Sequence, residues 1–214
     1  MRSANSSGEE TEKAIREAAI KVIAKHGFQA ASLREIAKEV GIRAPSLYNY
    51  IQSKEKLLFE LLKVPVSAMI ADYKTLTKDV TDPVRRLQIF VQVHQDFHLH
   101  ARLEVFIGNM ELRSLTAAHY RVITGLRDEY SWLLTHIIED GVKTGVFHAP
   151  QPRVLTLVML GMLSGVCNWF QPNGAMSAAK MTELHTDLAF RMLGAKLPDK
   201  KAAATRKGRA ETVY

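Results

Sequence analysis

The sequence is poor in cysteine: Cys167 is the only one among 214 residues. A single thiol excludes an internal disulfide and a zinc site built from several cysteines, and it is typical of a protein in a reducing compartment. The first residues, MRSANSSGEE, contain no apolar run, so the sequence predicts no signal peptide. We therefore expect a cytoplasmic protein.

The usual signs of β-structure and catalysis are also missing. No segment alternates apolar and polar residues, and no Asn-Gly turn joins two such segments. No Gly-x-Ser-x-Gly elbow, Walker loop or dinucleotide-binding fingerprint occurs. His94 and His98 have the spacing of helical metal ligands and His100 is close, but no His-Glu-x-x-His motif or cysteine accompanies them. We expect these histidines to pack or form hydrogen bonds, a metal site being the less favoured interpretation, and we expect no cofactor.

The net charge of +7 is unevenly distributed along the chain. Residues 11–60 carry nine bases and six acids, and residues 196–214 carry six and two, whereas residues 61–195 carry thirteen and twelve. Basic ends on a nearly neutral body indicate a polyanionic partner such as nucleic acid, or simply a solubilising surface. The two termini are low in apolar residues, so both are expected to be disordered.

Helical periodicity dominates the first third of the chain. Apolar residues spaced by three and four from Ile15 predict a first helix that Gly27 ends. Ser32 and Glu35 form a capping box for a second helix, which Gly41 stops. The sequence therefore predicts a long helix, a sharp connection and a short helix.

Two further helices are expected directly afterwards. Pro45 suits the first turn of a short helix over residues 45–50. Ser53 caps a fourth helix, which Pro65 is expected to kink or end. Three helices of this length with a tight Gly41 turn are typical of a helix-turn-helix, whose last helix enters the major groove of DNA.

Residues 11–62 resemble the DNA-binding domain of the TetR/AcrR family of bacterial transcriptional regulators. The motifs are AASL, IAKEVGI and SLYNYIQSKEKL, which match the family pattern in order and spacing. Ile51 replaces the usual aromatic residue, and Asn49 stands where His, Tyr or Arg is common. The resemblance implies a homodimeric regulator, most often a repressor, that binds an operator in double-stranded DNA and responds to a small-molecule effector.

The resemblance also implies which residues contact DNA. Arg43 reaches a guanine edge or a phosphate, and Asn49 reads a base, since asparagine pairs with adenine through two hydrogen bonds. For Ser32 and Lys54, capping and surface roles remain as alternatives to phosphate contact. The implied DNA-contacting residues are Ser32, Arg43, Ala44, Pro45, Ser46, Tyr48, Asn49, Tyr50 and Lys54.

The rest of the chain also reads as helices. They are expected over residues 83–99, 103–114, 116–144, 153–169 and 177–194. Residues 154–179 contain no Asp, Glu, Lys or Arg. Small and polar residues interrupt this apolar stretch, so a helix buried in a dimer interface is favoured over a membrane span.

The C-terminal part resembles a subset of the same family, the regulators of fatty-acid and steroid degradation that sense acyl-CoA thioesters. The segments that carry the resemblance are GMLSGVCNWFQPNGAMSA, NMELRSL and LRDEYSWLL with IIEDGVKTGVF. An acyl-CoA or similar amphipathic effector needs an apolar tunnel and cations for its phosphates. The arginines are alternatively surface or interhelical charges, and Trp169 alternatively packs in the dimer. The implied ligand-contacting residues are Phe90, His94, Phe97, Phe106, Met110, Arg113, Arg127 and Trp169.

These observations predict an all-α protein with four regions. They are a disordered N-terminus (1–10), a helix-turn-helix DNA-binding domain (11–56), a ligand-binding and dimerisation domain (57–195) and a basic disordered tail (196–214). Two rival functions remain open: a helical enzyme acting on acyl-CoA, which would turn over a thioester, and a non-specific nucleic-acid-packing protein, which would bind all duplexes equally.

Overall fold

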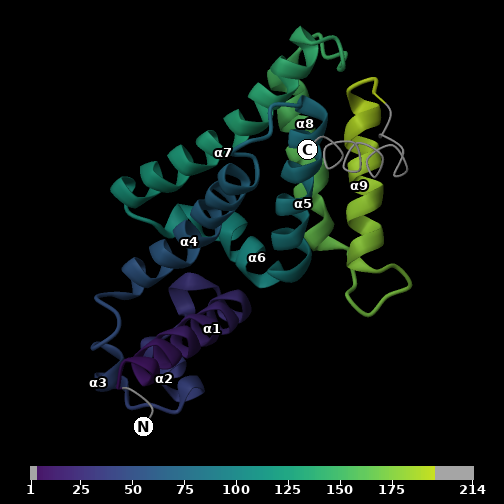
Figure 1. Ribbon diagram of the computed structural model, residues 1–214. Coiled ribbons are helices and arrows are strands. Elements are labelled where there is room, and N and C mark those ends of the chain that lie inside the picture. The colour runs from purple at the N-terminus through teal and green to yellow at the C-terminus, as the bar shows by residue number, and fades with distance from the viewer. Residues whose placement is uncertain (1–3, 196–214) are drawn as a thin grey trace, which may run out of the picture.

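The computed structural model describes residues 4–195, and every regular element within that range is a helix (Figure 1). The all-α prediction is therefore confirmed. The expected basic tail lies outside the described residues. The elements are α1 (Ala4–Ala30), α2 (Leu33–Val40), α3 (Ala44–Leu47), α4 (Lys54–Leu76), α5 (Pro83–His100), α6 (Arg102–Met110), η1 (Leu112–Ser114), α7 (Ala117–Lys143), α8 (Pro152–Gly165), η2 (Val166–Asn168) and α9 (Ala178–Met192).

Side-chain caps fix where five of these helices begin. In each case a side-chain oxygen accepts a hydrogen bond from a backbone N–H two or three residues later, at 3.0–3.3 Å. Such a bond satisfies one of the N–H groups that a helix leaves unpaired at its start. The predicted caps at Ser32 and Ser53 are confirmed. The five capping residues are Ser32, Ser53, Asp82, Thr116 and Ser177.

The N-terminus departs from the expectation of disorder over residues 1–10, because α1 already begins at Ala4. The buried stripe that starts at Ile15 fixes the helix, and adding turns to an existing helix costs little. The expected break at Gly27 is present as a kink with φ 77° inside α1.

Two other boundaries differ from the sequence-based expectation. Helix α3 is a single turn that ends at Leu47, and residues 48–50 continue as turns closed by bonds to carbonyls three residues earlier. Helix α4 runs through Pro65 without ending. Proline removes one backbone hydrogen bond, and packing of α4 against α5 and α7 compensates for this loss.

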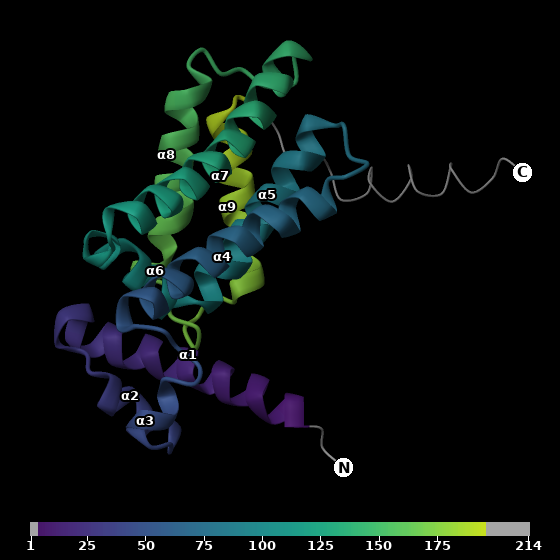
Figure 2. The ribbon, with the colours of Figure 1, turned by 90° about the vertical axis from the view of Figure 1, so that its left-hand side faces the viewer.

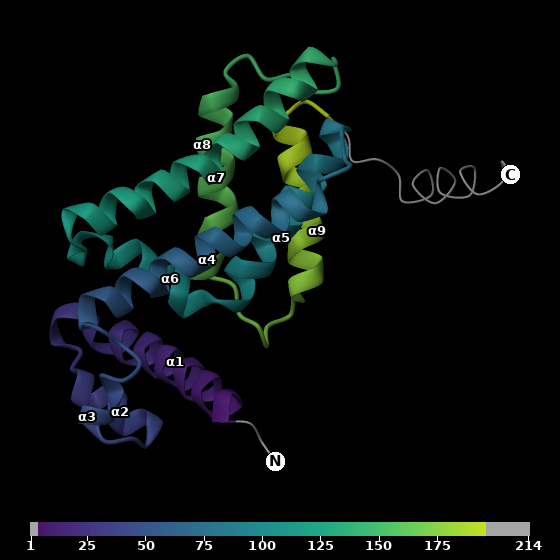
Figure 3. The same ribbon diagram turned by 60° about the vertical axis from the view of Figure 1, so that its left-hand side comes forward.

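The buried side chains form two main clusters, and α4 belongs to both. The N-terminal cluster joins α1–α3 to the first half of α4 and continues as far as Leu62, with Ile107 of α6 and Ile123 of α7. The body cluster joins the second half of α4 to α5, α7, α8 and α9. Figures 2 and 3 show the N-terminal helices below this body, with α4 rising from one to the other. The boundary expected at residue 56 therefore falls inside a continuous helix.

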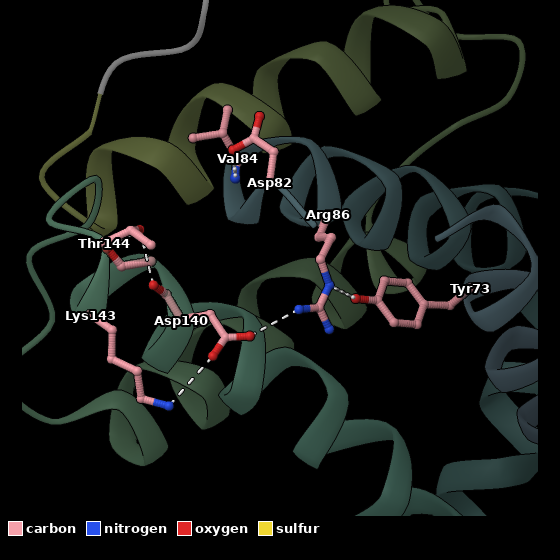
Figure 4. Close-up of polar contacts among 8 residues, drawn as sticks. Tyr73, Asp82, Val84, Arg86, Asp140, Lys143 and Thr144 are labelled. Atoms are coloured by element: carbon pink, nitrogen blue, oxygen red, sulfur yellow. Dashed lines mark hydrogen bonds and ion pairs between the residues drawn. The ribbon is translucent and has the colours of Figure 1, made fainter. Parts of the chain in front are cut away.

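A polar network joins the end of α4, the start of α5 and the end of α7 (Figure 4). Arg86 donates from Nε to the Tyr73 hydroxyl at 3.2 Å and from Nη1 to Asp140 Oδ2 at 3.0 Å. Burial raises the pKa of the Tyr73 phenol, so it stays protonated at neutral pH. Because three helices share one guanidinium, this part of the body forms a fixed frame.

Candidate functional site

The α2–α3 turn presents a small polar and aromatic surface. Gly41 has φ 78° and ψ 24°, a left-handed conformation that favours glycine, and the N–H of Ile42 reaches back to the Ala37 carbonyl at 3.0 Å. Leu47 is fully buried in the N-terminal cluster, which fixes α3 on α2. A helix too short to be stable alone is thus held in one orientation.

Most of the expected DNA-contacting residues lie on the outer side of this turn. Tyr48 is 60% exposed, and Asn49 and Tyr50 are also exposed. Arg43 is exposed at the start of α3, and Ser32 is exposed at the start of α2. Ala44 and Ser46 are half-buried beside them, whereas Pro45 is exposed.

Lys54 has a partner inside the protein. Its Nζ donates to the Gln29 carbonyl at 3.1 Å and lies 4.5 Å from the centroid of the Phe28 ring. The side chain therefore joins the start of α4 to the end of α1. This contact favours the structural alternative for Lys54.

Two acidic residues connect the N-terminal helices to the body. The Glu55 carboxylate accepts hydrogen bonds from the Thr116 backbone N–H at 3.0 Å and from His119 Nδ1 at 2.8 Å. Burial alone would raise the pKa of Glu55, but these two donors hold it below its ordinary value. Glu111 Oε1 accepts from the Phe28 N–H at 3.0 Å. These bonds link the segment after α6 to the end of α1, and the start of α7 to the start of α4.

A cavity of about 240 Å³ lies in the body between α4, α5, α6, α7 and α8. Eight apolar residues line it, five of them on α4: Leu61, Leu62, Pro65, Val66, Met69, Phe97, Val105 and Leu160. A second group supplies the polar wall together with the backbone of Gly108: His94, His98, Glu104, Asn109, Arg127, Tyr130 and Ser164. This mixture is typical of a small-molecule site.

Of the expected ligand-contacting residues, the structure brings His94, Phe97 and Arg127 to this cavity. Phe90 is buried just behind the wall, where its ring stacks on Tyr130 with centroids 4.8 Å apart. The cavity lining thus contains residues from α5 and α7 that the sequence singled out, with Phe90 supporting them from behind.

The other four expected residues are not part of the cavity lining. Helix α6 turns Val105 and Gly108 inward, so Phe106 and Met110 on its other side are about half exposed. Arg113 is exposed in η1, and Trp169 is exposed after η2. A role for these four in ligand contact stays a prediction without support from this cavity.

Sequence reasoning missed most of the polar wall. His98 follows His94 by one helical turn, so periodicity alone was a signal that both face the same side. Tyr130 and Ser164 come from α7 and α8, and no local pattern indicates that they meet His94. His100 points elsewhere: it is exposed, and its Nδ1 bonds the Asp96 carbonyl. The three histidines therefore do not form one cluster.

The polar wall is built around two stacked histidine rings, whose centroids are 3.8 Å apart. His94 lies between Ser164 Oγ, 3.1 Å from its Nε2, and the Tyr130 hydroxyl, 3.3 Å from its Nδ1. His98 Nδ1 bonds the His94 carbonyl at 2.8 Å. Burial holds the pKa of His94 well below its ordinary value and lowers the pKa of His98 to about 4. Both rings are therefore neutral at pH 7.

The neutral His98 should make the fold sensitive to acid. An unfolded histidine has a pKa of about 6.5, so between pH 6.5 and 4 the unfolded chain binds more protons than the folded chain. The free energy of unfolding therefore falls as pH falls, by about 3 kcal/mol from pH 7 to pH 4 for this group. Urea titrations at both pH values, at one protein concentration, measure the loss.

A matched pair of variants tests whether His98 causes this acid-induced loss of stability. His98→Phe should reduce the acid-induced loss, whereas His100→Phe, on the same helix but exposed, should leave it as in the wild type. Residual acid sensitivity in His98→Phe is expected from His94 and His185, because burial lowers the pKa of both. An unchanged pH dependence in His98→Phe would contradict the prediction.

Arg127 lies at one side of the cavity and tethers α6. Its Nη2 donates to the Gly108 carbonyl at 2.7 Å. Burial lowers the pKa of the guanidinium, which nevertheless keeps its charge. The described residues give it no acidic partner. Its remaining N–H groups are therefore free to bind an anionic group.

The helices α8 and α9 expose an apolar surface. Val154, Leu157 and Val158 follow one face of α8 at helical spacing, and Leu184 and Leu188 do so on α9. Contiguous exposed apolar residues mark a surface that another molecule covers. Among residues 4–195, no helix has the length and apolar content needed to cross a membrane.

Comparisons with known proteins match both halves of the chain. A family model described as "Bacterial regulatory proteins, tetR family" matches residues 15–61, and one described as "Tetracyclin repressor-like, C-terminal domain" matches residues 80–193. The HTH-type transcriptional repressor KstR2 of Rhodococcus jostii is 25% identical over 186 residues, which are 86% of this chain and 90% of that protein.

Two solved structures are similar over most of their length. A regulatory protein in the tetR family from Rhodococcus RHA1 has a TM-score of 0.77 and 28% identity, covering 86% of this chain and 97% of that one. The structure of AibR in complex with isovaleryl coenzyme A and operator DNA has a TM-score of 0.75 and 24% identity, covering 84% and 98%.

Proposed function

The chain belongs to the tetR family of bacterial regulatory proteins and is a DNA-binding transcriptional regulator, and we propose that it is a repressor that an acyl-CoA thioester releases from its operator. The observation that carries this proposal is one body helix, α4, that starts beside the helix-turn-helix and lines the effector cavity. It works in the cytoplasm, where the operator and the thioester both occur.

The helix-turn-helix reads the operator with its exposed edge. Asn49 contacts base edges in the major groove, and Tyr48 and Tyr50 hold phosphates on either side. Arg43 and the start of α3 approach the same groove, and Ser32 contacts phosphate from the start of α2. Lys54 supports DNA binding indirectly, because its Nζ donates a hydrogen bond to the Gln29 carbonyl. Residues 11–56 supply all of these contacts, and residues 57–195 supply effector binding and the dimer.

The protein binds its operator as a homodimer. Two recognition helices must reach successive major grooves about 34 Å apart. The apolar surface of α8 and α9 (Val154, Leu157, Val158, Leu184 and Leu188) forms the interface between the two protomers. Burying this surface removes five apolar side chains from water, which stabilises the dimer.

The effector inserts its acyl part into the cavity. Drug-sized ligands occupy pockets of about 300–1,000 Å³, so a volume of about 240 Å³ accepts an acyl group and excludes a nucleotide. Arg127 is placed to bind an anionic group of the part that stays outside. AibR, which has the same fold, is described in complex with isovaleryl coenzyme A, a short-chain thioester. The relatives are regulators, and the buried neutral histidines serve as hydrogen-bonding groups, so we infer that the protein is not an enzyme.

Effector binding shifts a conformational equilibrium. A ligand that binds the remaining N–H groups of Arg127 shifts the guanidinium and so displaces α6, whose Gly108 carbonyl the same guanidinium holds. Because Glu111 follows α6 and accepts from the Phe28 N–H, a displaced α6 moves the helix-turn-helix. The effector changes operator affinity only by its preference for the displaced form.

Tyr48→Ala should weaken operator binding, since it removes two exposed phosphate-contacting side chains from the dimer. We expect a loss of about tenfold or more, because hydrogen bonds to charged groups contribute about 1.5–3 kcal/mol. Gel shifts with DNA upstream of the protein's own gene measure it. The control is Tyr120→Ala, which removes a tyrosine that is 45% exposed on α7 and should leave affinity unchanged.

The same assay separates the rival functions. Asn49→Ala should relax base preference more than it lowers affinity. Equal competition by random DNA would favour a non-specific packing protein, and hydrolysis or transfer of an added thioester would favour an enzyme. Loss of affinity in both tyrosine variants alike would contradict the assignment of the recognition edge.

A further inference from the structure

We propose that the acyl group recognised by this cavity carries a hydroxyl group, so that the effector is a hydroxyacyl thioester. This inference rests on the proposed function and specifies its ligand. It follows from the hydrogen-bonding atoms around His94 and His98 that have no partner within the protein.

His98 offers an acceptor to the cavity. Its Nδ1 must carry the proton, because the partner of that nitrogen is the His94 carbonyl, which only accepts. The neutral ring therefore has a lone pair on Nε2. No described residue forms a hydrogen bond with this nitrogen. The fully buried side-chain atoms that lack a hydrogen-bond partner are Gln95 Oε1 and His185 Nδ1, and His98 Nε2 is not one of them. Since His98 is 7% exposed and lines the cavity, its Nε2 faces that space.

The polar wall also offers the cavity a hydrogen-bond donor. Tyr130, His94 and Ser164 hold one proton each when the ring is neutral, and their two hydrogen bonds use two of the three. If His94 Nδ1 carries the proton, the Tyr130 hydroxyl keeps a free one. If Nε2 carries it, Ser164 keeps the free one. Either hydroxyl lines the cavity.

A ligand that fits the part of the wall formed by His94, His98, Tyr130 and Ser164 presents one donor and one acceptor there. The acyl carbonyl supplies the acceptor for the free hydroxyl proton. The cavity is too small to admit the amide groups of coenzyme A as well, so the donor for His98 comes from the acyl group itself. A hydroxyl near the carbonyl provides both within a few atoms. An unsubstituted acyl group would displace water from His98 and leave its nitrogen unpaired, which costs affinity.

The test compares butyryl-CoA with both enantiomers of 3-hydroxybutyryl-CoA, by calorimetric titration of the full-length dimer. We expect one enantiomer to bind about tenfold tighter than butyryl-CoA, since leaving a buried acceptor unpaired weakens binding by about that factor. In His98→Leu the preference should disappear. In His100→Leu it should persist, because that histidine makes the same bond to its own helix but is exposed.

The outcomes separate this inference from the proposed function. Butyryl-CoA binding as tightly as both hydroxy forms, or a preference unchanged in His98→Leu, overturns the hydroxyl inference and leaves the acyl-CoA proposal intact. Failure of all three thioesters to bind overturns both. If His98→Leu does not fold, the ratio of the wild-type affinities for 3-hydroxybutyryl-CoA and butyryl-CoA alone tests the hydroxyl inference.

Discussion

Leu157→Glu is expected to convert the protein to a monomer and to remove measurable operator binding. Leu157 is 55% exposed between Val154 and Val158 on α8. In the proposed symmetric interface each glutamate faces a desolvated apolar surface, and burying an unpaired charge is strongly unfavourable. Loss of the second recognition helix should lower operator affinity by more than about 100-fold.

Sedimentation equilibrium and gel shifts together measure this effect. The matched control is Leu76→Glu, because Leu76 is 56% exposed at the end of α4 and outside the α8–α9 surface. That variant should stay dimeric and bind DNA. A Leu157→Glu protein that sediments as a dimer would show that another surface joins the protomers.

Gly141→Ala should be the most destabilising small substitution in the body. A Cβ at this position would overlap the ring of Phe147, with Phe147 Cγ only 2.6 Å away. The ring is buried and packs edge-on against Phe190, and the Phe147 N–H bonds the Gly141 carbonyl at 3.0 Å. Because relieving this overlap disturbs a buried ring and a hydrogen-bonded turn, we expect the free energy of unfolding to fall by about 3 kcal/mol.

Gly125→Ala provides the opposite result on the same helix. A Cβ at Gly125 meets nothing within 4 Å, so alanine should raise the free energy of unfolding by about 0.5–1 kcal/mol through its higher helix propensity. Urea unfolding of both variants at one protein concentration gives the comparison. Equal effects of the two substitutions would mean that the Phe147 ring is free to move.

Features set by neighbouring residues were predictable from the sequence. Ser32 and Ser53 cap their helices because the bond spans three residues, and the Gly41 turn follows from one backbone conformation. The rotation of α7 about its axis does not follow from its sequence range alone. Ile123, Tyr130 and Ile137 are buried, whereas Val122 is exposed. Periodicity defines a stripe, and packing against the neighbouring helices fixes its rotation.

Features that join distant residues were not predictable. Glu111 and Phe28 are 83 residues apart, and Glu55 and His119 are 64 apart. No local pattern relates such pairs. The same holds for Trp169, for which the resemblance implied a ligand contact, whereas the structure places it 57% exposed beyond η2.

Helix α4 has a consequence for protein engineering. Since it passes unbroken from the N-terminal cluster into the cavity wall, no flexible junction separates the reading module from the sensing module. A chimaera that exchanges one module must be spliced within this helix and keep its register. One residue inserted there would rotate everything beyond it by about 100°, and the pair of reading modules would no longer match the spacing of the duplex.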